Sequence, residues 1–269
     1  MLNAQDQRDE MHYALPQRKT AHPAPYEVKP RRSLRQNRTL RAVVAVLGAL
    51  AFLLLIYRLF PWPSSTEKVL SKAPHGYPNV VVVTTIDPAL EKVDPQFIES
   101  IKANRIEYAA KHGYKTFFPY TEHYRHKLEA SPSSWAKVPA VRHAMANNTN
   151  TPYFFYIDHK TLIMNMDLSI EDHVMDKKRL EANSLIDVPV IPPDSIIKTF
   201  SGVPGDKVNM VISQDKDGLM PNAFVMRQGE WSKFMLDVWF DPMYQRYNFQ
   251  KAERHALEHI IQYVPFYDF

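Results

Sequence analysis

The segment Tyr153–Asn165 constrains the fold of this 269-residue chain more than any other. An unbroken apolar and aromatic run stops at one carboxylate, Asp158, and apolar residues resume at Leu162. A short apolar run of this kind is typical of a buried strand. Open α/β sheets bind ligands at the carboxyl ends of their strands. The segment therefore predicts a sheet whose functional edge lies at Asp158.

Strands and helices alternate along the residues around this segment. The β-branched run Val80–Thr85 predicts another buried strand. Asp94-Pro95 predicts a helix start and Gly113 the end of that helix. The next strand, Tyr114–Phe118, completes a βαβ unit. Further helices are predicted over 139–146, 231–239 and 257–261, and further strands over 208–213 and 223–226. The pattern predicts an α/β domain with a mostly parallel sheet flanked by helices.

The positive charge of the chain gathers at its amino-terminal end. Residues 1–60 hold 10 Lys and Arg against 4 Asp and Glu, whereas the remaining residues hold 23 against 25. Residues 1–41 are rich in proline and polar side chains, so we predict a disordered basic tail there. Because the predicted domain has no excess of positive charge, it is not expected to bind nucleic acid.

An apolar run, Ala42–Tyr57, follows the basic tail and is closed by Arg58. A buried core helix is the alternative for so short a run. The run has no polar face, however, and this favours a membrane. We therefore predict a transmembrane signal anchor over 42–60 and a stem over 61–76, with Trp62 at the interface.

The distribution of basic residues also predicts an orientation in the membrane. Lys and Arg gather on the cytosolic side of an anchor, so residues 77–269 are expected in the lumen of a single-pass type II protein. The short apolar run suits the thinner membranes of the early secretory pathway. Asn147-Asn148-Thr149 is then a glycosylation acceptor at Asn147. The chain has no cysteine, so its fold depends on the apolar core alone.

Six segments, in a fixed order, resemble glycosyltransferase family 34, the fungal Golgi α-1,6-mannosyltransferases and α-galactosyltransferases. They are NRIEYAAKHGY (104–114), SWAKVPA (134–140), LIMN (162–165), VISQD (211–215), WSKFMLDVWFDP (231–242) and HALEHIIQ (255–262). The resemblance extends from about residue 77 to the end. It is strongest to the mannosyltransferase subunits of the fungal mannan-polymerizing complex.

The resemblance implies a GT-A-like fold, a Rossmann-type and mostly parallel sheet behind the single N-terminal transmembrane helix. It implies Mn²⁺ and the retaining transfer of mannose from GDP-mannose to the α-1,6-linked mannan outer chains of N-glycans. It also implies a place in a hetero-oligomeric complex of the Golgi membrane. Two alternatives remain open: a weakly active or inactive structural subunit of such a complex, and an α-galactosyltransferase that uses UDP-galactose.

The resemblance places Asp158 at the first position of an Asp-x-Asp motif, which holds a divalent metal against the donor diphosphate. Asp158 is thus the expected catalytic, donor-binding and metal-binding residue. Lys160 stands where the second acid would be, and its ammonium could partly replace the metal at the diphosphate. A solvated lysine is the alternative. His159 is expected on the opposite face of the strand from Asp158 and Lys160, because side chains alternate along a strand.

Two further cations are candidates for the donor site. Lys137, between Trp135 and Pro139, could contact the base or a phosphate, and a surface lysine is the alternative. Arg105 could reach a phosphate from the helix that follows the first strand. A salt bridge of Arg105 with a neighbouring glutamate, Glu99 or Glu107, is equally compatible with the sequence.

Two polar residues near the later strands are candidate catalytic residues. Asp215 follows a strand, where a loop can present an acid to an acceptor sugar. Asn222 could bind a sugar hydroxyl. His255 and His259 share a helix face at i, i+4, but without a His-Glu-x-x-His sequence they are only a weak indication of a metal site.

The chain departs from the family pattern at three further places. Met220-Pro221-Asn222 stands where family members commonly have Asn-Ala-Gly, and Glu253-Arg254 stands for an acid-glutamine pair. The family's C-terminal His-Phe-Ala-Gly segment has no counterpart before Phe269. We therefore expect 77–269 to be a C-terminally truncated glycosyltransferase domain.

Overall fold

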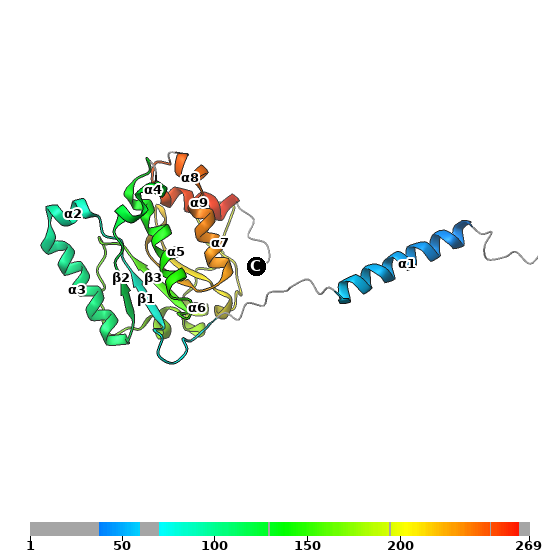
Figure 1. Cartoon of the computed structure of the whole chain (residues 1–269), viewed down its shortest axis with the longest axis horizontal. Coiled ribbons are helices and arrows are strands. Elements are labelled where there is room, and N and C mark those ends of the chain that lie inside the picture. The colour runs from blue at the N-terminus through cyan, green and yellow to red at the C-terminus, as the bar shows by residue number, and fades with distance from the viewer. Residues whose placement is uncertain (1–37, 60–69, 129, 194, 248, 264–269) are drawn as a thin grey trace, which may run out of the picture. The chain divides into compact units, whose positions relative to one another are not determined.

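The computed structural model of the chain describes residues 38–59, 70–128, 130–193, 195–247 and 249–263 (Figure 1). The chain divides into two units, Met1–Ser65 and Thr66–Phe269. Residues 1–37 of the predicted tail and 60–69 around the predicted stem lie outside the described residues.

The described part of the first unit is a helix, α1 (Arg38–Leu59). It begins within the predicted disordered tail, so residues 38–41 are helical. Within the described ranges, no helix is long and apolar enough to cross a membrane. The structure therefore does not confirm the transmembrane anchor predicted over 42–60.

The second unit is built on a mixed sheet of five described strands in the order β2-β1-β3-β5-β4. The strands are β1 (Val80–Val83), β2 (Lys115–Phe117), β3 (Tyr153–Ile157), β4 (Met210–Asp215) and β5 (Gly218–Arg227). β1 pairs in parallel with β2 and β3, whereas β5 is antiparallel to both β3 and β4. The prediction of a mostly parallel sheet is wrong for this second half. A tight turn between Asp215 and Gly218 joins β4 to β5, and so short a connection permits only antiparallel pairing.

Helices cover both faces of this sheet (Figure 1). The helices are α2 (Pro88–Val93), α3 (Pro95–His112), α4 (Arg125–Leu128), α5 (Lys137–Asn147), α6 (Lys177–Asn183), α7 (Glu230–Trp239), α8 (Pro242–Arg246) and α9 (Glu253–Tyr263). Single turns are η2 (Thr121–Tyr124), η3 (Ser133–Ala136), η4 (Ile170–Val174) and η5 (Gly205–Lys207). The helices predicted over 95–112, 139–146, 231–239 and 257–261 are confirmed as α3, α5, α7 and α9.

The ends of α3 show how the sequence determines the helix. The Asp94 side chain accepts a hydrogen bond from the Phe97 backbone N–H at 2.9 Å, which satisfies one of the free donors of the first turn. Gly113 adopts a left-handed conformation with φ of 69° and ends the helix. Tyr114 then leads directly into β2.

Two apolar cores form on opposite faces of the sheet. Val81, Val83, Phe154 and Tyr156 face one core, which α5, α7 and α9 complete with residues such as Trp239. The alternate residues of β1 and β3 face the other core, together with Tyr108 of α3 and the segment from Ile163 to Leu180. Because both faces are buried, β1 and β3 read as continuous apolar runs.

Candidate functional site

The carboxylate of Asp158 lies in a tight turn directly after β3. The Thr161 backbone N–H donates to the Asp158 carbonyl oxygen at 3.0 Å and closes this turn. The Lys160 backbone N–H donates to Asp158 Oδ1 at 3.0 Å, and this contact fixes the carboxylate on its own turn. The Asp158 side chain is only 14% exposed. The predicted functional carboxylate is therefore held in one orientation at the end of a buried strand.

His159 and Lys160 do not continue the alternation of β3. The strand ends at Ile157, so the expectation that His159 points away from Asp158 is wrong. His159 Nδ1 lies 3.3 Å from Asp158 Oδ1. Lys160 contacts Asp158 through its backbone, and its side chain is exposed. A turn has no two-residue period, and this is why the rule for strands does not apply here.

Arg105 of α3 fixes the Asp158 turn by hydrogen bonds to its backbone. Its side chain is completely buried, and Nη2 donates to the carbonyl oxygens of Asp158, at 2.9 Å, and Thr161. Nη1 donates to Asn104 Oδ1 at 2.9 Å. Asn104 in turn exchanges two hydrogen bonds of 3.0 Å with the backbone of Ile163. The structure thus places Arg105 as a clamp on backbone carbonyls, and contact with a phosphate stays a prediction.

Burial of Arg105 changes its protonation only within the alkaline range. Desolvation lowers the pKa of Arg105 to about 10, and the nearby charge of Asp158 opposes this effect. The guanidinium therefore stays protonated at neutral pH. It supplies a fixed positive charge next to the Asp158 turn.

Lys137 forms a buried ion pair next to β3. Its Nζ is 2.7 Å from Glu253 Oε1, and both side chains are less than 10% exposed. Nζ also lies 5.7 Å from the centre of the Tyr156 ring. Burial, followed by the charge of Asp158, raises the pKa of Tyr156 well above its ordinary value. The predicted alternative of a surface lysine is wrong, and contact of Lys137 with the donor remains a prediction.

Asn222 faces Asp158 because the regular β3–β5 pairing of Ile157 with Ala223 continues by one residue, whereas β5 is irregular on its β4 side. Ile212 of β4 pairs with Phe224, but the next residue, Ser213, pairs with Met220. The residues between them, 221–223, form a bulge, a position that tolerates the missing N–H of proline. The Asn222 carbonyl oxygen accepts the Asp158 backbone N–H at 2.8 Å. The structure therefore brings these two predicted site residues into direct contact.

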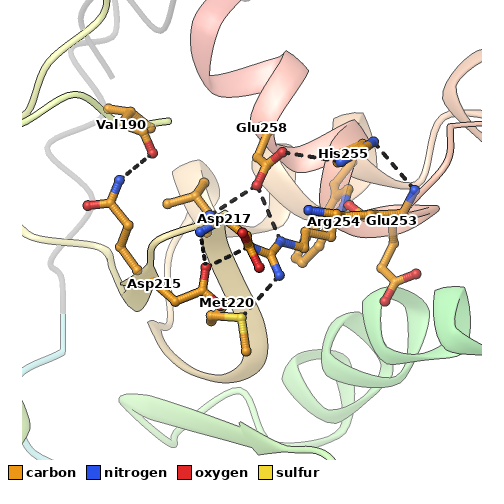
Figure 2. Close-up of polar contacts among 12 residues, drawn as sticks. Val190, Asp215, Asp217, Met220, Glu253, Arg254, His255 and Glu258 are labelled. Carbon is orange, nitrogen blue, oxygen red and sulfur yellow. Dashed lines mark hydrogen bonds and ion pairs between the residues drawn. The ribbon is translucent and has the colours of Figure 1, made fainter. Parts of the chain in front are cut away.

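Asp215 lies at the same edge, in the turn between β4 and β5 (Figure 2). Its Oδ1 accepts hydrogen bonds from the Asp217 backbone N–H at 2.8 Å and from Arg254 Nη2 at 2.9 Å. Desolvation is the largest single effect and raises the pKa of Asp215. The bonds from Asp217 and Arg254 outweigh it, so the pKa is lowered overall. Asp215 is thus a charged, ion-paired carboxylate at neutral pH.

Arg254 and Glu258 of α9 hold the start of β5 (Figure 2). Glu258 Oε1 accepts the Leu219 backbone N–H at 3.0 Å and lies 3.4 Å from Arg254 Nε. Arg254 Nη1 is 3.2 Å from the sulfur of Met220. A Cβ atom at Gly218 would lie 2.2 Å from Glu258 Oε1, so this position requires glycine. The hairpin turn is therefore attached to α9 by one charged network.

The remaining predicted residues lie apart from the Asp158 turn. Asn147 ends α5 and is exposed, as a glycosylation acceptor must be. The His255 ring contacts Glu258, with Nε2 3.9 Å from Oε2. The His259 ring instead packs against aromatic rings, among them Tyr263 at 4.7 Å between centroids. The structure gives these two histidines different partners and does not bring them to a common ligand site.

The described residues contain no group of three or more His, Asp or Glu side chains that could hold a metal ion. Asp158 therefore fits only the kind of divalent-cation site that uses one or two carboxylates together with substrate phosphates. Such a site is compatible with Mn²⁺ bound between Asp158 and a donor diphosphate.

Sequence reasoning missed two residues of this edge, Glu258 and Tyr156. Glu258 lies at i, i+4 from Arg254, a spacing that could have indicated the pair. Tyr156 carried no signal, because an aromatic residue in a buried strand is expected to be core. Its hydroxyl lies 3.1 Å from Thr85 Oγ1, which follows β1.

Comparison with known proteins assigns the chain to a family. The family model described as the galactosyl transferase GMA12/MNN10 family matches residues 76–266. An alpha-1,2-galactosyltransferase of Schizosaccharomyces pombe is 30% identical over 180 residues, 63% of this chain and 46% of the relative. The probable alpha-1,6-mannosyltransferase MNN11 of Saccharomyces cerevisiae is 29% identical over 206 residues, 74% of this chain and 48% of the relative. The chain thus spans about half the length of these relatives.

One solved structure also resembles the chain, a glycosyltransferase involved in the glycosylation of the major capsid of PBCV-1. The TM-score is 0.39 at 12% identity, over 70% of this chain and 77% of that chain.

Proposed function

Because the chain belongs to glycosyltransferase family 34, the GMA12/MNN10 family, we propose that it is a hexosyltransferase with a GT-A-like fold. The proposed reaction transfers mannose from GDP-mannose to α-1,6-linked mannan outer chains of N-glycans, with retention of configuration. The observation that carries this proposal is the position of Asp158. Its carboxylate is fixed at the carboxyl end of β3, beside Asn222, in a chain whose family transfers hexoses.

Retaining hexosyl transfer depends more on stabilising the leaving diphosphate than on a strong base. Asp158 would hold Mn²⁺ together with diphosphate oxygens, and the ion would supply Lewis-acid stabilisation of the leaving group. Among the described contacts of the carboxylate, Oδ1 takes the bond from Lys160 N–H. We assign Oδ2 to the ion or to a hydroxyl of the donor.

Mannose is proposed as the sugar ahead of galactose. This order rests on the resemblance of the six segments to the mannosyltransferase subunits, because the relatives themselves do not separate the two sugars. A galactosyltransferase relative matches over 207 residues and the mannosyltransferase relative over 206. UDP-galactose remains the alternative donor, because the same strand end and diphosphate site serve both nucleotides. The Golgi membrane, a hetero-oligomeric complex and glycosylation at Asn147 are further proposals, carried by the resemblance and by the basic amino-terminal residues.

A second candidate, a weakly active or inactive subunit of a transferase complex, is favoured by a specific observation. Arg254 stands where the family has glutamine, and it binds the carboxylate of Asp215 at 2.9 Å. A catalytic role of Asp215 toward an acceptor would need this ion pair to open. The second candidate therefore predicts binding of the donor without turnover.

One experiment separates these candidates. The purified full chain is incubated with GDP-mannose or UDP-galactose and an α-1,6-linked mannobiose, with Mn²⁺ or with EDTA, and the products are identified by NMR. We expect an α-linked mannosyl product from GDP-mannose. Product from UDP-galactose alone would assign the alternative donor. Binding of GDP-mannose without any product would support the inactive subunit and contradict the proposed activity.

Lys160 allows a sharper test of the metal requirement. If its ammonium partly replaces the metal, transfer persists in EDTA and falls at least tenfold in Lys160→Ala, the effect expected for removing a donor that stabilises developing charge. Lys178→Ala, at an exposed lysine of α6, is the matched control and should leave the rate unchanged. EDTA-sensitive transfer that ignores Lys160→Ala would show that Lys160 is a solvated side chain.

A further inference from the structure

A hollow of about 320 Å³ opens between η3, α8 and the start of α9. The lining residues that matter to the argument are Ser131, Trp135, Tyr244, Gln245, Arg246 and Phe249. The hollow is not lined by Asp158, Asn222 or Asp215, so it is separate from the candidate site described above. Its volume is within the range of small-molecule sites, roughly 300–1,000 Å³.

The floor of the hollow is aromatic and rigid. Trp135 is 1% exposed and Tyr244 8% exposed, and the Trp135 ring packs edge-on against Phe240 at 6.5 Å. Gln245 is fixed as well, since its Nε2 donates to the Phe240 carbonyl oxygen at 2.8 Å. A ligand would therefore meet a preformed surface.

An exposed aromatic ring, Tyr247, adjoins the lining residue Phe249. Tyr247 is 70% exposed, and its ring lies 5.0 Å from the ring of Phe249, which lines the hollow. An exposed tyrosine offers an apolar face and a polar hydroxyl at the same time. The lining and the Tyr247 ring together combine aromatic faces with one guanidinium, one amide and the hydroxyls of Ser131, Tyr244 and Tyr247.

This combination fits a sugar ring better than a nucleotide. A pyranose presents an apolar C–H face and a polar edge of hydroxyls, which aromatic rings and hydrogen-bonding side chains match. The described lining contributes one charged side chain, Arg246. A diphosphate would call for several cations or a bound metal. The hollow is therefore suited to a neutral saccharide.

A series of polar contacts runs from Ser134, beside the hollow, to β3. Ser134, next to Trp135, donates its hydroxyl to Glu253 Oε2 at 2.5 Å. The other oxygen of Glu253 pairs with Lys137, which lies over the Tyr156 ring. Tyr156 lies on β3, two residues before Asp158. The polar contacts thus lead from Ser134, next to the lining residue Trp135, to the strand that carries Asp158 at its end.

We infer that this hollow, together with the adjoining ring of Tyr247, binds a sugar unit of the acceptor chain away from the unit that reacts. The inference rests on the proposed function, because it takes the acceptor to be an α-linked oligosaccharide. It adds to the proposed function a second binding site, at which longer acceptor chains are distinguished from shorter ones. The subsite would make longer acceptors bind more tightly than a single sugar.

The test measures binding of the full chain to α-1,6-linked mannotriose by NMR titration in the absence of donor. Tyr247→Ala and Arg246→Ala should each weaken binding by roughly tenfold, and each tenfold corresponds to about 1.4 kcal/mol. Tyr247→Phe keeps the aromatic face and should bind within about twofold of the unaltered chain. Tyr77→Ala removes a ring that is 54% exposed and, unlike Tyr247, has no described ring contact with a lining residue, so it is the matched control.

Transfer kinetics provide the second measurement. In Tyr247→Ala, KM should rise for mannotriose and stay constant for methyl α-mannoside, while kcat is unchanged for both. Mannotriose that does not bind the unaltered chain, or binds Tyr247→Ala equally well, overturns the subsite even if hexose is transferred. If mannotriose binding depends on Tyr247 but no donor supports turnover, the saccharide site stands and the proposed activity fails.

Discussion

Two arginine side chains hold two turns at the same edge of the sheet, and they do so by different means. Arg105 is fully buried and donates to the backbone carbonyls of Asp158 and Thr161. Arg254 is 16% exposed and binds two carboxylates, Asp215 and Glu258. The first turn carries the candidate metal-binding carboxylate, whereas the second closes the β4–β5 hairpin.

The two means differ in what can weaken them. The hydrogen bonds of Arg105 depend on the planar geometry of the guanidinium, and their acceptors are backbone carbonyls, which do not titrate. A clamp on carboxylates depends on charge, so acid and salt act on it. The Asp158 turn is therefore expected to keep its contacts when the pH or the salt concentration changes. The hairpin is the part that solution conditions can loosen.

The largest effect is expected at the buried clamp. Arg105→Ala leaves two partly buried carbonyls without this donor and opens a cavity at a fully buried side chain, so we expect the free energy of unfolding to fall by about 3–5 kcal/mol. Urea unfolding followed by circular dichroism measures the change. Arg105→Lys should restore less than half of the loss, because an ammonium cannot reproduce the fork of donors. A loss below about 1 kcal/mol for Arg105→Ala would show that the turn holds itself.

The difference between the clamps also explains what the sequence could predict of the fold. The ends of α3 were predictable, because Asp94 and Gly113 act on their immediate neighbours. The hairpin was not, because Pro221 and Asn222 resemble a loop and β5 runs through both as a bulge. Strand pairing depends on the partner across the sheet. A single-strand pattern therefore gives the existence of a strand but leaves its direction open.

The site was predictable to the same extent. Asp158 was identified because an apolar run ends at a charge, and both Asn222 and Asp215 lie at the predicted edge. The role of Arg105 was not predictable, because its carbonyl partners are 53 and 56 residues away and leave no side-chain signature. Lys137 was a candidate donor-binding residue, but its pairing with Glu253 depends on how α5 and α9 pack together.

A smaller effect is expected at the hairpin, where Gly218 meets Glu258. Gly218→Ala introduces a Cβ atom 2.2 Å from Glu258 Oε1 at a residue with φ of 121°, so we expect a loss of about 2–3 kcal/mol. Thermal unfolding of Gly218→Ala, of Glu258→Ala and of the double variant separates the two causes, with Glu258→Ala as the reference because it also removes the contacts of Glu258 with Leu219 and Arg254. The double variant relieves the clash and keeps the backbone strain.

The matched control for this glycine is Gly113. It has φ of 69° and nothing within 4 Å of an added Cβ, so Gly113→Ala should cost only about 1 kcal/mol. Equal losses at Gly113 and Gly218 would show that backbone conformation alone matters. The attachment of the hairpin to α9 would then carry no weight in its stability.

The smallest effect is expected from the charge of Asp215, and it distinguishes the two clamps by pH. The folded-state pKa of Asp215 is lowered, so the ion pair with Arg254 stabilises the fold at a pH above the unfolded value of about 3.9. This stabilisation is lost as the pH falls through the lower folded value.

Asp215→Asn keeps the hydrogen-bond acceptor and removes only the charge. Its Tm should lie below that of the unaltered chain by a constant amount above about pH 5, and the gap should close below about pH 4. Salt should narrow this difference in Tm at neutral pH. The loss of stability in Arg105→Ala should instead persist above about pH 5, below about pH 4 and in salt. A gap in Tm that ignores pH and salt would mean that Asp215 holds its turn as Asn would, by hydrogen bonding alone.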